Sequence, residues 1–218
     1  MKFEFNEIEH NGHKIVRLNT GSITTKYIRE VLPELPCRDN MEYRLFMRPA
    51  KAEDKALKEV LSKCSGEFPN LVLGFGIEFP SSRMWRYVDK GIDMDEVLES
   101  LRTCGSNGMR VNANLVLGWN NLTEDDVREL EHFMDSIPEN SITNVQLRWL
   151  FAHPYTKIHD TYEGEAIKLG PFYIGFRPEI SEKQMVLNKE AGDIIVQYSS
   201  IKHFNVEGLG NIKKISKC

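Results

Sequence analysis

The feature that most restricts the fold of this chain is a regular alternation of short apolar runs with amphipathic segments. Five strand-like runs begin at residues 14, 42, 70, 109 and 142: KIVRL, EYRLFMRP, NLVLGFGIE, MRVNANLVLG and ITNVQLRWLF. Segments with apolar residues at helical spacing separate them, at about 30–35 residues per repeat, which is typical of parallel strands joined by helical crossovers. The pattern predicts an α/β fold with a parallel sheet.

The boundaries of several helices can also be predicted. We expect helices over 24–35, 51–64 and 81–90, the last with Gly91 just past its end. Two further amphipathic helices are predicted after Asp93 and Thr123, and these two residues are expected to be their N-caps. At the N-terminus, Asn11-Gly12 between two strand-like runs predicts a hairpin.

The alternation stops after Pro154. The remaining residues contain one helical pattern, from Ser181 to about Ile194, among loops and short strands. We therefore expect two parts, a main domain over 1–158 and a small C-terminal extension over 159–218.

Composition narrows the class of protein. The 218 residues carry a net charge of −4, which argues against a broad basic surface for nucleic acid. Apolar runs are shorter than the roughly 20 residues of a membrane helix, and the N-terminus lacks the apolar core of a signal peptide, so we expect a cytoplasmic protein. The four cysteines are at least 27 positions apart, which predicts no metal site built from this chain alone.

Polar residues occupy one face of several strands that should be buried between helices. The residues on these faces are Arg44 and Arg48; Asn112 and Asn114; and Asn144, Gln146 and Arg148. In NLVLGFGIE the corresponding face is formed by small residues and ends at Glu78. We interpret these faces as the interior of an open, partial TIM-like half-barrel, with ligand-binding groups at the carboxyl ends of the strands. An antiparallel sheet with one solvated face is the alternative, which the helical spacers disfavour.

Several segments resemble the radical S-adenosylmethionine (radical SAM) family. GIEFPSSRMWRYVDKGIDMDEVLESLR is similar to that family's GIES-x-S-x-R…KGI segment, and RVNANLVLGWNNLTEDDV to its next strand and turn. LRWLFAHPYTKI occupies the place of the sixth strand and its loop, and HKIVRLNTGSITTKYIREVLPEL resembles the second strand and helix. The segments cover roughly residues 14–158 in the family's order.

The resemblance implies that SAM binds across the carboxyl ends of the strands. Carried over by position, the cofactor contacts are Glu78, Ser81, Asn112, Asn114, Arg148 and, in the turn after the second strand, Gly21. A carboxylate can accept hydrogen bonds from ribose hydroxyls or an amino group, and an Asn amide can both donate and accept. For substrate we expect contacts from His153, Tyr155 and Arg48, and we assign no catalytic residue.

Each of these assignments has a structural alternative. Glu78 can cap a helix or pair with Arg83, and Arg48 or Arg148 can pair with Glu78 inside the barrel. Asn112 can bond a neighbouring loop, and His153 can be an ordinary surface residue. The tryptophans are expected in packing, although Trp119 follows a strand and can also cover a ligand.

The sequence also departs from the family pattern. We find no CxxxCxxC loop, which in the family holds the iron–sulfur cluster, and the first strand of the barrel has no counterpart, as if the chain began one βα unit late. The family's GGEP segment reads NTGSI, and Phe79-Pro80 follows Glu78 in place of Ser-Gly.

Two functions remain open. One is a radical SAM enzyme component that binds SAM, while the [4Fe–4S] cluster is held by a segment or partner chain elsewhere. The other is a degenerate, cluster-free half-barrel that serves as a binding or scaffold protein, alone or as a homo-oligomer. An unrelated α/β hydrolase or transferase is disfavoured, because no nucleophile elbow or phosphate loop is present.

Overall fold

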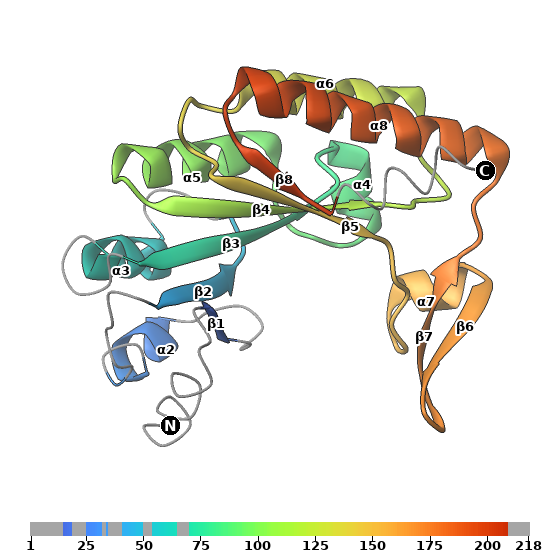
Figure 1. Cartoon of the computed structure of the whole chain (residues 1–218), viewed down its shortest axis with the longest axis horizontal. Coiled ribbons are helices and arrows are strands. Elements are labelled where there is room, and N and C mark those ends of the chain that lie inside the picture. Colours follow the sequence, from blue (N-terminus) through green and yellow to red (C-terminus); the bar gives the residue numbers. More distant parts are fainter. Residues whose placement is uncertain are drawn as a thin grey trace. The chain divides into compact units, whose positions relative to one another are not determined.

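A computed structural model describes residues 15–18, 25–31, 34, 41–49, 54–64 and 70–208 (Figure 1). The predicted hairpin around Asn11 lies outside these residues, as does Gly21. The strands are β1 (Ile15–Leu18), β2 (Glu42–Met47), β3 (Leu71–Glu78), β4 (Arg110–Leu117), β5 (Asn144–Trp149), β6 (Gly164–Leu169), β7 (Phe172–Pro178) and β8 (Asn205–Glu207). The helices are α2 (Thr25–Glu30), α3 (Lys55–Cys64), α4 (Ser82–Tyr87), α5 (Met94–Ser106), α6 (Glu124–Ser136), α7 (Lys157–Thr161) and α8 (Glu182–Ile201).

Six strands form one parallel sheet in the order β1-β2-β3-β4-β5-β8, and β6 and β7 form a separate antiparallel hairpin. The pairings of β1 with β2, of β2 with β3 and of β5 with β8 are parallel. Each of the five strand-like runs found in the sequence contributes one strand to this sheet. The predicted α/β class and partial TIM-like architecture are thus confirmed.

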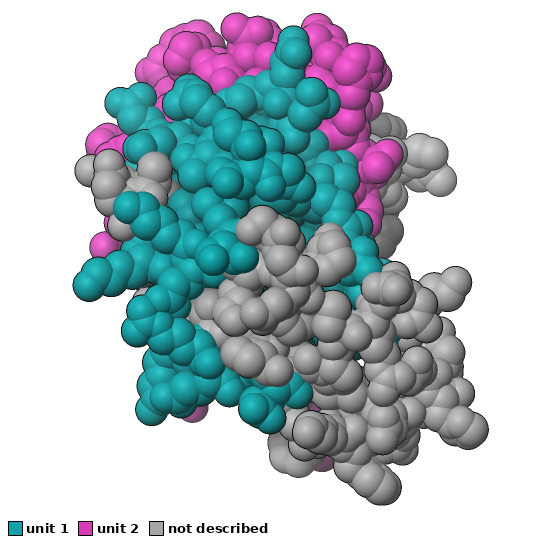
Figure 2. Space-filling model, turned by 90° about the vertical axis from the view of Figure 1, so that its left-hand side faces the viewer, with its two compact units in different colours: residues 1–77, 95–113, 138–143 teal, residues 78–94, 114–137, 144–218 magenta. Residues whose placement is uncertain are grey.

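The chain divides into two compact units, which are coloured separately in Figure 2. Unit 1 comprises residues 1–77, 95–113 and 138–143, and unit 2 comprises residues 78–94, 114–137 and 144–218. The carboxyl ends of β3 and β4 and the whole of β5 belong to unit 2.

In unit 1, the apolar residues of the strands build the core. Alternate residues of β2 are buried, and β3 is buried over its first five residues, from Leu71 to Phe75. Gly74 lies against Phe46, because a Cβ atom at Gly74 would approach that ring to 2.6 Å. The close approach that glycine permits here is therefore used by a side chain of the neighbouring strand.

In unit 2, α6 packs against α8 and against α4. Thr123 caps α6 with a full capping box, as its sequence position predicts, and Ser181, where the second helical pattern begins, is the N-cap of α8. Helix α8 continues to Ile201, beyond the expected end near residue 194. Strand β8 then pairs with β5, so residues beyond 158 add a strand to the main sheet. The division into domains at residue 158 stays a prediction.

The segment after Glu78 folds differently from the expectation. Helix α4 ends at Tyr87, with Val88 as its C-cap, rather than at Lys90. The chain then takes left-handed conformations at Asp89 and again at Gly91. This early end lets Lys90 lie outside the helix.

Candidate functional site

A cavity of about 420 Å³ lies in unit 2 beyond the carboxyl ends of β3, β4 and β5. We call it the strand-end cavity. Its charged and polar lining includes Glu78, Lys90, Arg148 and His153, and its aromatic lining is Trp119, Trp149 and Phe151. A volume of this size is in the usual range of small-molecule sites, about 300–1,000 Å³.

Glu78 is the last residue of β3 and has a left-handed backbone, with φ at +66°. A non-glycine residue in this conformation is uncommon and is often found where function requires it. Its carboxylate accepts a hydrogen bond from Lys90 Nζ at 2.7 Å, and the two side chains are 31% and 17% exposed. Glu78 therefore pairs with Lys90, not with Arg83, and the N-cap of α4 is Ser81.

Arg148 contributes a second cationic group to the cavity. Its Nη2 donates to Gln146 Oε1 at 3.0 Å, and the residue is exposed. Within the described residues no ion pair links Arg148 to Glu78. No ion pair between Arg148 and an acid is found in the part of the chain that the structure describes, so its guanidinium is suited to hold a carboxylate or phosphate of a ligand.

The aromatic wall is fixed by close packing. Gly118 has φ at +91°, and a Cβ atom there would come within 2.7 Å of the Trp149 indole, so glycine is required on both counts. Trp119 is 2% exposed, and its Nε1 donates to Val116 O at 2.7 Å. The His153 ring contacts the Phe151 ring edge-on, with centroids 4.6 Å apart.

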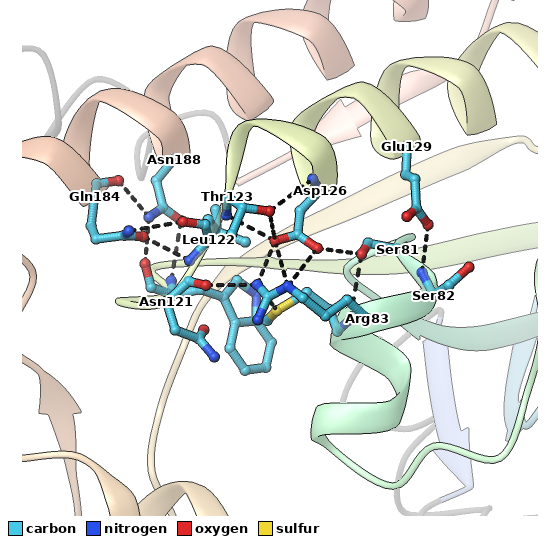
Figure 3. Close-up of polar contacts among 12 residues, drawn as sticks. Ser81, Ser82, Arg83, Asn121, Leu122, Thr123, Asp126, Glu129, Gln184 and Asn188 are labelled. Atoms are coloured by element: carbon cyan, nitrogen blue, oxygen red, sulfur yellow. Dashed lines mark hydrogen bonds and ion pairs between the residues drawn. The ribbon is translucent and has the colours of Figure 1, made fainter.

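A second polar group in unit 2 surrounds Asp126 in the first turn of α6 (Figure 3). Asp126 is 1% exposed and pairs with Arg83, whose Nε lies 3.0 Å from Oδ2. Ser81 Oγ donates to Oδ1, and Thr123 donates to Oδ2 through its backbone N–H at 2.8 Å and its hydroxyl at 2.7 Å. Burial alone would raise the pKa of the Asp126 carboxyl, but the hydrogen bonds from Arg83, Ser81 and Thr123 outweigh it and lower the pKa.

The structure brings some predicted site residues together and separates others. Glu78, Arg148 and His153 all line the strand-end cavity. Ser81 is completely buried, and its hydroxyl is used by Asp126 and by the Met84 N–H. Tyr155 is fully exposed, with a left-handed backbone.

The other predicted residues lie on different parts of the chain. Asn114 is buried on β4 within unit 2, and Asn112, two residues earlier, belongs to unit 1. Arg48 is exposed just after β2 in unit 1. The ligand contacts assigned to these residues stay predictions.

Two residues that sequence reasoning did not assign are central to unit 2. Lys90 is the partner of Glu78, twelve residues away, and no local pattern identifies it. Asp126 has a local signal, since it stands three residues after Thr123 in a capping-box position. Its pairing with Arg83 has no such signal.

The described residues contain no cluster of three or more His, Cys, Asp or Glu side chains that is arranged to hold a metal ion. Cys104 is fully buried, and burial raises the pKa of its thiol to about 12. A thiol of this kind is a poor metal ligand and nucleophile. Among the same residues, no helix is both long and apolar enough to cross a membrane.

Comparison with known proteins shows a radical SAM-like fold. Solved structures with a similar fold include the cobalamin- and [4Fe–4S]-bound radical SAM methyltransferase TsrM from Kitasatospora setae, with a TM-score of 0.51 and 14% identity over 78% of this chain. They also include archaeal Elp3 from Methanocaldococcus infernus, with a TM-score of 0.55 and 12% identity over 99% of this chain.

This chain spans only 32% of the TsrM structure and 57% of the Elp3 structure. No protein-family model and no curated protein matches the sequence. At these identities the comparison shows a shared fold and nothing about activity.

Proposed function

We propose that the strand-end cavity binds S-adenosylmethionine and that the chain is a radical SAM-like protein or enzyme component. The observation that carries this proposal is the meeting of Glu78, Arg148 and an aromatic wall at the carboxyl ends of neighbouring parallel strands. Ligands of parallel α/β folds bind at this edge of the sheet. The likeness to TsrM, which is a radical SAM enzyme, supports the choice of ligand.

The chemistry of the lining suits each part of SAM. The Glu78 carboxylate can accept hydrogen bonds from the amino group or ribose hydroxyls, and the Arg148 guanidinium can hold the carboxylate. Trp149 and Phe151 are both half-buried and offer flat apolar surfaces for the adenine. Because the Trp149 indole packs closely at Gly118, little of its side-chain entropy is lost on binding.

The side chains that the structure describes do not fit an iron–sulfur cluster: they include one cysteine, Cys104, which is buried, and no group of three or more His, Cys, Asp or Glu arranged to hold a metal ion. We therefore propose that cluster ligands come from another segment or from a partner chain. A cluster supplied in this way would provide the electron for reductive cleavage of SAM. This chain would bind the cofactor, orient it and shield it from water.

Calorimetry with SAM tests the proposal directly. We expect saturable binding by the wild-type chain and an affinity about tenfold lower for Glu78→Gln, which keeps the size of the side chain but removes its charge. Asp125→Asn is the matched control, because Asp125 is an exposed acid on α6 that lies outside the cavity. Absence of wild-type binding, with or without a cluster-bearing partner, would refute the proposal.

A cluster-free binding or scaffold protein is the second candidate. It is favoured by Phe79 and Pro80, which are both buried directly beside Glu78 and replace the Ser-Gly of the family pattern. The two candidates differ in redox chemistry. The test mixes this chain with a cluster-bearing partial chain from a neighbouring reading frame and measures SAM cleavage under reducing conditions. If this chain binds SAM but no such mixture cleaves it, the second candidate is correct.

A further inference from the structure

The loop that follows β4 is held by two side-chain amides of α8, all within unit 2 (Figure 3). Asn188 Oδ1 accepts the backbone N–H of Gly118 at 2.6 Å and that of Trp119 at 3.1 Å. Asn188 Nδ2 donates to Trp119 O at 2.6 Å and to Gln184 O at 2.7 Å. One amide thus satisfies three backbone groups of the loop.

Gln184 repeats this arrangement one helical turn earlier. Its Oε1 accepts the Leu122 N–H at 2.8 Å, and its Nε2 donates to Leu122 O at 2.9 Å. The two amides bind the loop over residues 118–122 much as a neighbouring strand would. We call these five loop residues and the two amides the loop clamp.

Packing alone does not explain an amide at position 188. Asn188 is fully buried, and it lies in the apolar stripe of α8 that contains Leu187, Ala191 and Ile195. A buried amide is costly unless its hydrogen bonds are made, and Asn is a weak helix former. The hydrogen bonds to the loop are what compensate for it here.

The clamped loop contributes Trp119 to the aromatic wall of the strand-end cavity. Trp119 lines the cavity, and its backbone N–H and C=O are both bonded to Asn188. The neighbouring Gly118, also bonded to Asn188, carries the Trp149 indole against its Cα atom. Both tryptophans of the wall therefore depend on the position of the same amide.

We infer that Asn188 and Gln184 are positioning residues for the ligand of the strand-end cavity: they hold the loop that carries Trp119 and that places Gly118 against Trp149, so that a planar aromatic group is received against a fixed wall. This inference rests on the proposed SAM site for the identity of the ligand. The role of the two amides in holding the aromatic wall does not depend on whether the ligand is SAM.

Tryptophan emission, together with acrylamide quenching, reads the wall directly. We expect Asn188→Ala to shift the emission to longer wavelength and to increase quenching. Comparison with Trp119→Phe gives the part of the emission that comes from Trp119. The same variant should bind SAM about tenfold more weakly, the equivalent of about 1.4 kcal/mol. Lys189→Ala is the control, because Lys189 is the exposed neighbour on α8 and pairs only with Asp193 within the described residues; it should match wild type in both measurements.

Gln184→Ala keeps the test valid if Asn188→Ala does not fold, because Gln184 is only half-buried and lies near the start of α8. It should give smaller changes in the same direction, and Gln184→Glu, which retains the acceptor for Leu122 N–H, should restore part of the wild-type behaviour. Unchanged emission and quenching in folded Asn188→Ala or Gln184→Ala would overturn the inference. If the wild-type chain does not bind SAM but the variants show the emission shifts, SAM is the wrong ligand, and the positioning of the aromatic wall by Asn188 and Gln184 is still supported.

Discussion

Asp126 and Glu78 are two carboxylates of the same unit with opposite surroundings. Asp126 is almost fully buried, and three residues donate hydrogen bonds to its two oxygens. Glu78 is about one-third exposed, stands in a strained backbone conformation at the edge of a cavity and has one lysine as its partner. The first has no capacity left for a ligand, and the second has most of its lone pairs available.

The difference indicates what each acid contributes. A buried acid with every hydrogen bond made fixes α4 against α6, because its donors come from both elements. An acid that is about one-third exposed, and that shares a cavity with Arg148 and an aromatic wall, stabilises the fold little and is suited to binding. The four predictions below test this division between a structural and a binding carboxylate, from the largest expected effect to the smallest.

Replacing Asp126 should produce the largest loss of stability. Asp126→Ala leaves Arg83 and two hydroxyl groups without their acceptor, and we expect the free energy of unfolding to fall by about 3 kcal/mol. For a chain of this size that lowers Tm by about 6–12 °C, measurable by calorimetry. Asp125→Ala is the control; its exposed pair with Arg128 should change stability by less than about 0.5 kcal/mol.

Acid should weaken the wild-type protein through the same carboxylate. Because the pKa of Asp126 is lowered in the folded state, its contribution is complete above the ordinary aspartate pKa of about 3.9 and disappears as the pH falls through the lower folded value. We expect the stability advantage of wild type over Asp126→Asn, measured by urea unfolding, to shrink as the pH is lowered from 6 to 3. If the stabilities of wild type and Asp126→Asn change with pH in parallel, Asp126 does not have a lowered pKa in the folded state.

Glu78→Gly should separate binding from stability. Glycine relieves the left-handed backbone but adds freedom to the unfolded chain, so the free energy of unfolding should stay within about 1 kcal/mol of wild type. Loss of the carboxylate should weaken SAM binding about tenfold or more. A large loss of stability with unchanged affinity would show that Glu78 is a structural acid like Asp126.

Arg148→Gln should have the smallest effect. Its side chain is exposed, so stability should change by less than about 0.5 kcal/mol. Affinity for SAM should fall by about three- to fivefold, and by less in high salt, where the charge interaction is screened. Arg102→Gln, at an exposed position on α5 outside the cavity, should leave affinity unchanged in the same titration.

Much of the fold followed from local patterns. The period of two in MRVNANLVLG and the helical stripe after Thr123 specify a strand and a capped helix, and both are found where they were predicted. The position of Glu78 at the end of β3 was also readable, because the apolar run stops at that acid. Helix α4 was predicted too long, since the left-handed turn at Asp89 has no sequence signal comparable to Gly91.

The sequence by itself determined the order of strands and helices, because hydrophobic periodicity and caps act over a few neighbouring residues. Only the tertiary structure decided which polar groups meet: Arg83 with Asp126 across 43 residues, and Asn188 with Gly118 across 70. Such pairs depend on how elements pack, and side-chain chemistry alone leaves many partners equally suitable. For that reason the strand that carries Glu78 was predictable, but its partner Lys90 and the clamped wall beside it were not.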